Sequence, residues 1–430
     1  LGNHKGYFGF IVLWLGFEWL HYNWELSHPW NTLGNTFANS TPLIQWYEYT
    51  GVLGGSLWIL IVNLILFRVF KKTFLYKESL KNNLKVCCLV GTVILLPMLF
   101  SFLIYTTFSE KENPIEIVVV QPNIDPYHEK FGGLSEIDQM ERILSLARKK
   151  VTPNTKYVLA PETAIPESSD EQLIEHNYGI IEIRKFLKEF PHVKFIIGMT
   201  SWIEYGIQDV KPTPTSRSFG NPLQYYDVFN TALLIDNSPS IQTYHKSKLV
   251  LGVEKLPYPK LLAPLESLAL HLGGTFGSLG VEKDAHNLRD GNFQIAPVIC
   301  YESIYGDYVT SYIRKGAELI FILTNDGWWA DTPGYQQHLA YARLRAIETR
   351  RSIARSANTG TSCFINQQGD VIAETNWWEQ DVLVNTINAN QEITFFTQHG
   401  DIIGRLSAAI ACLLLLASWT KRIKKRLTKS

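Results

Sequence analysis

The stretch QIAPVICYESIYGDYV, residues 294–309, places a cysteine, Cys300, at the end of an apolar run. Tyr301 and Glu302 follow it directly, and a Gly-Asp pair marks a turn just beyond them. The apolar run is typical of a buried strand, and α/β sheets present their chemistry where strands end. Cysteine is also among the most buried residue types, so a packed core thiol is the alternative. The place of Cys300 at a strand end makes it a candidate nucleophile.

Similar apolar runs recur on both sides of this stretch and stop at polar or turn residues. Amphipathic segments, such as 134–150 and 335–351, separate several of them, and residues 362–374 predict a hairpin. This alternation predicts an α/β domain with a largely buried mixed sheet flanked by helices. The predicted strands are 115–122, 156–162, 193–200, 229–236, 294–302 and 319–326.

The sequence of this domain contains no Gly-rich phosphate loop and no metal-ligand spacing. Three histidines, His271, His286 and His338, are scattered, and we expect them to be structural or surface residues rather than ligands. We therefore expect neither a metal nor a cofactor.

Four segments are apolar enough to cross a membrane. Residues 49–67 and 86–108 carry no charged side chain, and both exceed the ~18 residues that mark a spanning candidate. Residues 400–420 form a further candidate, and residues 6–24 carry Glu18. A carboxylate inside a span usually faces a bundle interior, so we expect Glu18 to have a packing or hydrogen-bonding role.

Basic residues predict how these spans are oriented. The formal net charge is 0, from 40 basic and 40 acidic side chains, so bulk charge gives no argument for nucleic acid. However, residues 68–85 and 421–430 each hold six basic residues, which predicts that both segments are cytoplasmic. The predicted plan is a membrane region over 1–109, an extracytoplasmic domain over 110–399, a span over 400–420 and a cytoplasmic tail over 421–430. Because no initiator Met is present, we expect the chain to be a fragment that lacks further spans before Leu1.

The cysteines restrict the chemistry of the extracytoplasmic domain. Of five cysteines, only Cys300 and Cys363 lie outside the predicted spans. A disulfide between them would silence a nucleophile at Cys300, and disulfides are common in oxidising compartments. We expect two free thiols, with Cys363 in a packing role.

Two other predicted strand ends carry partners for a thiol. The segment LAPETAIPE, 159–167, contains Glu162, and YHKSKLVLGVEKLPYP, 244–259, contains Lys246 and Glu254. A thiol with an ordinary pKa near ~8.5 is mostly protonated at neutral pH, so it needs a base or a cation nearby. Glu162 is a candidate base, and Lys246 a candidate for stabilising first a thiolate and then an oxyanion. Glu254 or Glu302 is expected to hold the lysine in place.

These motifs resemble the carbon–nitrogen hydrolase (nitrilase) superfamily, whose triad is Glu-Lys-Cys. The flanking spans, QWYEYTGVLGGSLW at 45–58 and LTNDGWW at 323–329 also resemble the apolipoprotein N-acyltransferase family of the bacterial inner membrane. One departure is LVLGVEKLP, 249–257, where family members commonly read LVPFGEFVP. The resemblance implies a nitrilase-like α-β-β-α sandwich with flanking transmembrane helices and a periplasmic active site.

The resemblance also implies roles for individual residues. Glu162 matches the family's general base, Lys246 its lysine and Cys300 its nucleophile, and Trp328 matches an aromatic near the lipid-binding cleft. The supporting positions match Glu254, Tyr301 and Glu302. The implied reaction moves an acyl chain from a phospholipid to the N-terminal diacylglyceryl-cysteine of an apolipoprotein, through a thioester on Cys300.

Two alternatives remain open at the level of sequence. One is a membrane-anchored, nitrilase-like amidase that acts on a small soluble substrate, and the other is a catalytically silent lipoprotein-binding module. An intact Glu162, Lys246 and Cys300 disfavours the silent module. Residues 256–274 are a candidate apolar loop that dips toward the bilayer, and an amphipathic helix packed on the domain is the alternative.

Overall fold

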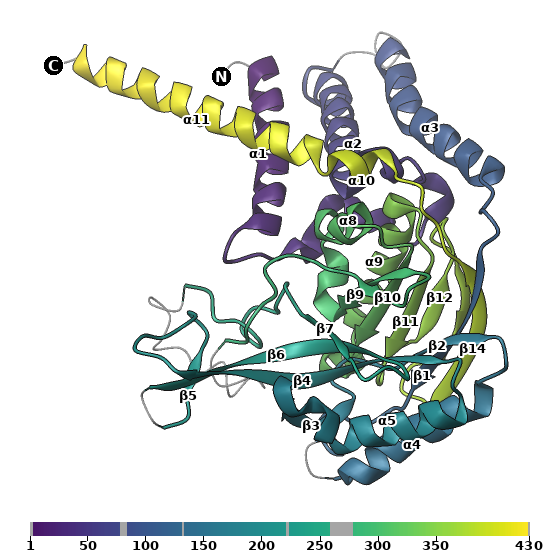
Figure 1. Ribbon diagram of the computed structural model, residues 1–430. Helices are drawn as coiled ribbons and strands as arrows, with labels where there is room; N and C mark the ends of the chain where they lie inside the picture. Colours follow the sequence, from purple (N-terminus) through teal and green to yellow (C-terminus); the bar gives the residue numbers. More distant parts are fainter. Residues whose placement is uncertain (1–2, 78–83, 131–132, 221–222, 259–277, 429–430) are drawn as a thin grey trace. The chain divides into compact units, whose positions relative to one another are not determined.

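The computed structural model describes residues 3–77, 84–130, 133–220, 223–258 and 278–428. The chain divides into two compact units, which are a helical unit of residues 1–109 and 394–430 and a sheet domain of residues 110–393 (Figure 1). We predicted 110–399 for the extracytoplasmic domain, whereas the short helix at Phe395–His399 belongs to the helical unit.

The helical unit contains long apolar helices. Its α-helices are α1 (Asn3–Asn23), α2 (Tyr47–Phe70), α3 (Leu84–Thr107), α10 (Phe395–His399) and α11 (Ile402–Leu427). Short helical turns are η1 (Pro29–Asn31), η2 (Leu33–Phe37), η3 (Thr41–Leu43) and η4 (Lys71–Leu75). Within the described residues, three helices are long and apolar enough to cross a membrane, namely Tyr47–Leu75, Leu84–Thr107 and Ile402–Leu427. The predicted span at 6–24 is helical as α1 but is not among these three.

Glu18 is buried inside the helical unit and bound by hydrogen bonds. Its Oε1 accepts from the Trp14 indole at 3.1 Å and from the backbone N–H of Leu33 at 2.9 Å. The carboxylate therefore joins α1 to the start of η2.

The sheet domain is built from two sheets. The first has the order β14-β1-β2-β4-β6-β5, with β3 paired to β4 and β7 to β6. Its strands are β1 (Pro114–Gln121), β2 (Thr155–Leu159), β3 (Ile165–Asp170), β4 (Lys194–Ile207), β5 (Arg217–Ser218), β6 (Gln224–Ile235), β7 (Gln242–His245) and β14 (Asp381–Asn388). The second has the order β13-β12-β11-β10-β9-β8. Its strands are β8 (Leu288–Arg289), β9 (Gln294–Ile299), β10 (Leu319–Thr324), β11 (Ile353–Ala357), β12 (Cys363–Ile365) and β13 (Val371–Glu374).

Helices complete the layers of the sheet domain. They are α4 (Glu136–Lys150), α5 (Tyr178–Glu189), α8 (Gly306–Arg314) and α9 (Pro333–Thr349), with the short turns η6 (Glu171–His176), η8 (Cys300–Ile304) and η9 (Asp326–Trp329). Figure 1 shows α4 and α5 against the first sheet and α8 and α9 beside the second. The predicted α/β sandwich is confirmed.

The alternation of side chains along β1 explains the layering. Val118 and Val120 pack in the core under α4 and α5, whereas Ile117 and Val119 belong to the core that includes both sheets. This is the period of two that a strand buried on both faces requires. Across the sheets, the ring centroids of Tyr157 on β2 and Phe321 on β10 lie 5.4 Å apart. The two sheets therefore face each other, and polar side chains just past their strand ends can meet.

Candidate active site

Glu162 lies in the segment that follows β2. Backbone hydrogen bonds from Ala160 to Ile196 and from Gly198 to Pro161 hold this segment against β4. A Cβ at Gly198 would lie 2.5 Å from the backbone nitrogen of Thr163, so the close approach requires glycine there. The Glu162 side chain is thereby fixed in the interior, where it is 6% exposed.

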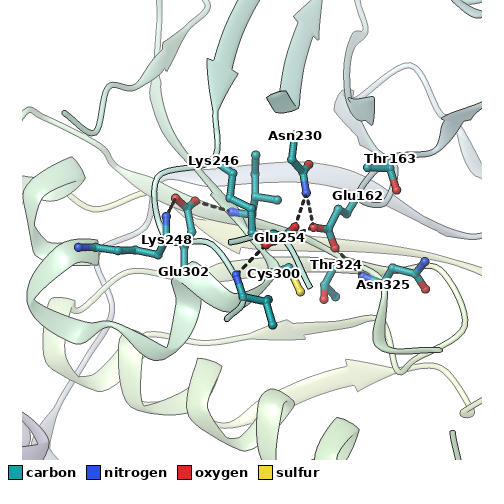
Figure 2. Close-up of polar contacts among 12 residues, drawn as sticks. Glu162, Thr163, Asn230, Lys246, Lys248, Glu254, Cys300, Glu302, Thr324 and Asn325 are labelled. Carbon is teal, nitrogen blue, oxygen red and sulfur yellow. Dashed lines mark hydrogen bonds and ion pairs between the residues drawn. The ribbon is translucent and has the colours of Figure 1, made fainter. Parts of the chain in front are cut away.

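Lys246 joins two carboxylates. It follows β7, and its backbone N–H donates to the carbonyl of Asn230 on β6 at 2.8 Å. Its Nζ donates to Glu162 Oε1 and to Glu254 Oε1, each at 2.9 Å. Asn230 Nδ2 donates to the same two oxygens, at 2.7 and 3.2 Å (Figure 2). The predicted contact between Glu254 and Lys246 is confirmed, whereas Asn230 was not predicted.

Cys300 is the first residue past β9 and begins η8. Its φ of +48° lies in the left-handed region, which costs a non-glycine residue roughly 1–3 kcal/mol and persists only where neighbours hold it. Figure 2 shows its sulfur beside Thr324, in the same cluster as Glu162, Lys246 and Glu254. The structure therefore brings the three predicted chemical residues together from β2, β7 and β9.

The charges of the cluster determine where the proton lies. Burial acts to raise the pKa of Glu162, but the charge and hydrogen bond of Lys246 outweigh it and hold that pKa below its usual range. Burial acts to lower the pKa of Lys246, but Glu162 and Glu254 hold it well above its usual range. For Cys300, burial raises the pKa far above its ordinary value, the charge of Glu162 adds to this, and Lys246 opposes it. The resting site thus holds a carboxylate, an ammonium and a thiol.

Glu302 holds the backbone around the site rather than the ammonium of Lys246. Its Oε1 accepts from the backbone N–H of Ser247 at 2.7 Å and from the Tyr244 hydroxyl at 2.8 Å, and its Oε2 accepts from the backbone N–H of Ile299 at 2.9 Å. Burial raises the pKa of Glu302 to about 7, although these donors act in the other direction. The carboxyl group thus ties the loop after β7 to the end of β9.

Tyr301 is buried beside the nucleophile and packs by its ring. Its ring centroid lies 5.6 Å from that of Tyr305 in an edge-to-face arrangement. Its position supports the shape of η8.

A buried histidine contacts the backbone of Cys300. His338 Nε2, from α9, lies 3.0 Å from the carbonyl oxygen of Cys300 and 2.9 Å from Ser303 Oγ. Because a carbonyl oxygen can only accept, Nε2 carries a proton. His338 Nδ1 lies 3.0 Å from Asp326 Oδ1, and Asp326 Oδ2 lies 2.5 Å from Arg355 Nη2. His338 is structural, as we expected, but the sequence did not show that it holds the nucleophile's turn.

Three consecutive residues at the end of β10, Thr324, Asn325 and Asp326, contact three different residues of the site. The Thr324 hydroxyl is hydrogen-bonded to the side chain of Cys300. The backbone N–H of Asn325 donates to Glu162 Oε2 at 3.1 Å. Asp326 then holds His338. The NDG motif, which we singled out only as part of a family pattern, therefore links the carboxylate to the nucleophile.

Trp328 extends from the same turn to the surface. Its side chain is 44% exposed, and its ring centroid lies 5.4 Å from that of Tyr127. Two apolar rings thus lie exposed close to the carboxylate-binding turn. The predicted membrane-dipping loop, 256–274, falls mostly on residues 259–277, which lie outside the described residues.

In the part of the chain that the structure describes, no group of three or more His, Cys, Asp or Glu side chains is arranged to hold a metal ion. Cys300 and Cys363 are both buried free thiols.

The cluster of Glu162, Lys246 and Cys300 lies where strands of two facing sheets end, as the resemblance to the carbon–nitrogen hydrolase superfamily implies. In agreement, the family model described as "Carbon-nitrogen hydrolase" matches residues 119–394. A second model, "Apolipoprotein N-acyltransferase N-terminal domain", matches residues 2–65.

Curated relatives match nearly the whole chain. The apolipoprotein N-acyltransferase of Chlorobaculum tepidum is 30% identical over 418 residues, which cover 95% of this chain and 76% of that protein. Apolipoprotein N-acyltransferase 1 of Treponema denticola is 28% identical, covering 96% and 77%, and the enzyme of Geobacter metallireducens is 26% identical, covering 96% and 74%. The chain belongs to the apolipoprotein N-acyltransferase family.

Proposed function

We propose that this chain acylates bacterial lipoproteins by moving an acyl chain from a phospholipid to the α-amine of an N-terminal diacylglyceryl-cysteine. The observation that carries the proposal is the ammonium of Lys246, bound at 2.9 Å to both Glu162 and Glu254 in the cluster that contains the Cys300 thiol. Family membership supports lipoprotein N-acylation as the reaction, and this geometry supports the residues that perform it.

In the first half of the reaction, Cys300 takes the acyl chain. As the sulfur attacks the ester carbonyl, the Glu162 carboxylate accepts the thiol proton. Because the pKa of this thiol is raised far above its ordinary value, the transfer during attack avoids forming a free thiolate first. The ammonium of Lys246 stabilises the oxyanion of the tetrahedral intermediate. The carbon–oxygen bond of the ester then breaks, the leaving alkoxide takes the proton back from Glu162, and a lysophospholipid departs.

In the second half, the thioester is transferred to the lipoprotein. The neutral α-amine attacks the thioester carbonyl, and a carbon–nitrogen bond forms. Glu162 accepts one amine proton and returns it to the departing sulfur as the carbon–sulfur bond breaks. The products are an amide and the original thiol, so no cofactor or external oxidant enters the balance.

We propose that the chain lies in the bacterial inner membrane with the sheet domain on the periplasmic side. The apolar helices α2, α3 and α11 support the spans, α1 is the proposed fourth span, and the basic segments 68–85 and 421–430 support the orientation. Cysteine labels near Lys77 and Lys424 should react only after the membrane is permeabilised, and a label near Asn287 should react without it. The reverse pattern would contradict the orientation.

The test of the proposed reaction is transfer to a defined acceptor. Membranes containing the protein are incubated with phospholipid and a diacylated lipopeptide, and the peptide is weighed. The expected result is a gain of one acyl chain with the natural protein and none with Cys300→Ala. Release of free fatty acid without a heavier peptide would instead favour a membrane-anchored amidase or hydrolase, and neither product would favour a silent binding module.

A further inference from the structure

A second lysine on the loop after β7 carries a charge that the proposed triad does not use. Lys248 lies two residues beyond Lys246, and its Nζ lies 5.4 Å from the ring centroid of Tyr305 and 5.1 Å from that of Tyr308. Across the described residues, its ammonium forms no hydrogen bond and no ion pair with a carboxylate, and its only direct partners are these two rings. Figure 2 shows its side chain reaching away from the carboxylate cluster that Lys246 enters.

The environment of Lys248 favours an anion. The side chain is half-buried, and burial lowers its pKa; the charge of Lys255 adds to this, and the charges of Glu302 and Asp307 only partly oppose it. Contacts with aromatic faces stabilise an ammonium without neutralising it. A half-buried ammonium that no carboxylate contacts directly gains free energy when a ligand supplies an anion at contact distance.

Lys248 is also fixed relative to the nucleophile. Glu302 Oε1 accepts the backbone N–H of Lys248 at 3.3 Å, and Glu302 Oε2 accepts the N–H of Ile299, the residue before Cys300. The Tyr308 hydroxyl lies 2.7 Å from the Tyr244 hydroxyl, which donates to Glu302 at 2.8 Å. One carboxyl group therefore positions the backbone of Lys248, one ring that contacts its ammonium and the turn that carries the sulfur.

We propose that Lys248 binds the phosphodiester of the acyl donor while Cys300 attacks its ester. The inference rests on the proposed function, and it names a subsite that the reaction itself does not require. In a phospholipid, only the glycerol backbone separates the phosphate from the reacting ester, so a phosphate site belongs near the nucleophile but outside the cluster of carboxylates. Lysine acts as a point charge toward phosphate and tolerates several headgroups beyond it.

The test compares two acyl donors that share a fatty acid but differ in the phosphate. Thioester formation on the protein is timed with a diacyl phospholipid and with the p-nitrophenyl ester of the same acid, which carries no phosphate. Lys248→Ala should lower kcat/KM for the phospholipid by about ten- to hundredfold, the range for losing one hydrogen bond to a charged group, and leave the p-nitrophenyl ester unchanged. Lys248→Arg should restore most of the loss, because it keeps the positive charge.

Lys283→Ala is the matched control, because Lys283 is an exposed lysine of the same domain and should affect neither donor. If Lys248→Ala slows the reaction with both donors equally, the lysine only stabilises η8 and α8. If Lys248→Ala slows the reaction with neither donor, the lysine does not contact the phosphate. Either result overturns the subsite while leaving the proposed function intact. Absence of a thioester from the natural protein with both donors would overturn the proposed function instead.

Discussion

Two cysteines of the second sheet present the same thiol in two settings. Cys363 begins β12, where it pairs with Arg355 on β11 and Glu374 on β13. Cys300 lies just past β9 with a φ of +48°, outside any ladder. Burial raises the pKa of Cys363 to about 12 and raises that of Cys300 further.

The comparison shows that neither thiol is reactive through its resting pKa. Both thiols have a cation nearby, and each cation is paired with carboxylates, Arg355 with Asp326 and Lys246 with Glu162 and Glu254. Carboxylates act on both thiols, Glu374 on Cys363 and Glu162 on Cys300. Cys300 differs because it lies outside the ladder at the start of η8, where Lys246 and Asn230 hold the Glu162 carboxylate in the same cluster. A base that accepts the proton during attack, rather than a preformed thiolate, is what distinguishes the proposed nucleophile.

The largest expected effect comes from removing that base. Glu162→Gln keeps the size of the side chain and can still accept from Lys246, but it cannot take the thiol proton. Thioester formation from phospholipid should slow by about 10²–10⁴-fold, the usual contribution of a general base. In the natural protein the rate should not fall as the pH is lowered from 7 to 5 through protonation of Glu162, because the pKa of Glu162 lies below its usual range. A near-normal rate in Glu162→Gln would contradict the assignment.

Lys246→Arg should be nearly as damaging as Lys246→Ala. The arginine keeps the charge, but a planar, forked guanidinium does not fit between two carboxylate oxygens that each lie 2.9 Å from Nζ. Losing one oxyanion donor typically slows a reaction by about 10²–10³-fold. Single-turnover acylation measures the effect, and an arginine variant with a normal rate would show that the lysine acts only by its charge at a distance.

His338→Ala should have a smaller effect, because His338 positions the backbone of Cys300 and does not touch the substrate. We expect kcat to fall about tenfold with little change in KM, which is within the range for losing one buried hydrogen bond. His338→Gln should recover part of the rate, since its amide can still donate to the carbonyl. His286→Ala, which removes a half-buried histidine bound to the carbonyl of Thr243, is the control. Loss through unfolding would appear as a lower melting temperature in His338→Ala without recovery in His338→Gln.

The smallest effect should come from Cys363→Ala. This thiol is fully buried within a regular strand, and its removal leaves only a small cavity. Turnover should stay within a few-fold of the natural protein, and the melting temperature should drop slightly. If this variant folds but is inactive, the assignment of Cys300 as the nucleophile is wrong.

The sequence predicted the parts of the site that follow an apolar run. Cys300 stands directly after β9 and Glu162 three residues past β2, each at the end of an apolar run. We expected Glu254 or Glu302 to hold Lys246, and the structure shows Glu254 in contact with its ammonium. Asn230 could not be predicted, because it lies inside β6 and only the pairing of β6 with β4 and β7 carries its amide to both carboxylates.

The role of His338 and several strands could not be predicted from the local sequence, because they depend on contacts between distant segments or lack an apolar run. His338 sits on α9, far along the chain from Cys300, and its role depends on the packing of α9 against η8. The strands β3, β5, β7, β8 and β14 were not predicted, because they are short or only partly buried and lack a continuous apolar run. The fully buried β11 was also missed, because Arg355 and Ser356 interrupt its apolar residues.

The central claim is that Cys300 carries the acyl chain between donor and acceptor, and intact-mass measurement tests it most directly. The protein, with its spans intact, is incubated with phospholipid but no lipopeptide. The account predicts an adduct of one fatty acyl group that neutral hydroxylamine removes, that maps to the peptide containing Cys300 and that a diacylated lipopeptide discharges. Cys300→Ala should carry no adduct, whereas Cys363→Ala should carry it in full. An adduct on any other residue, or rapid release of free fatty acid without an adduct, would contradict the account.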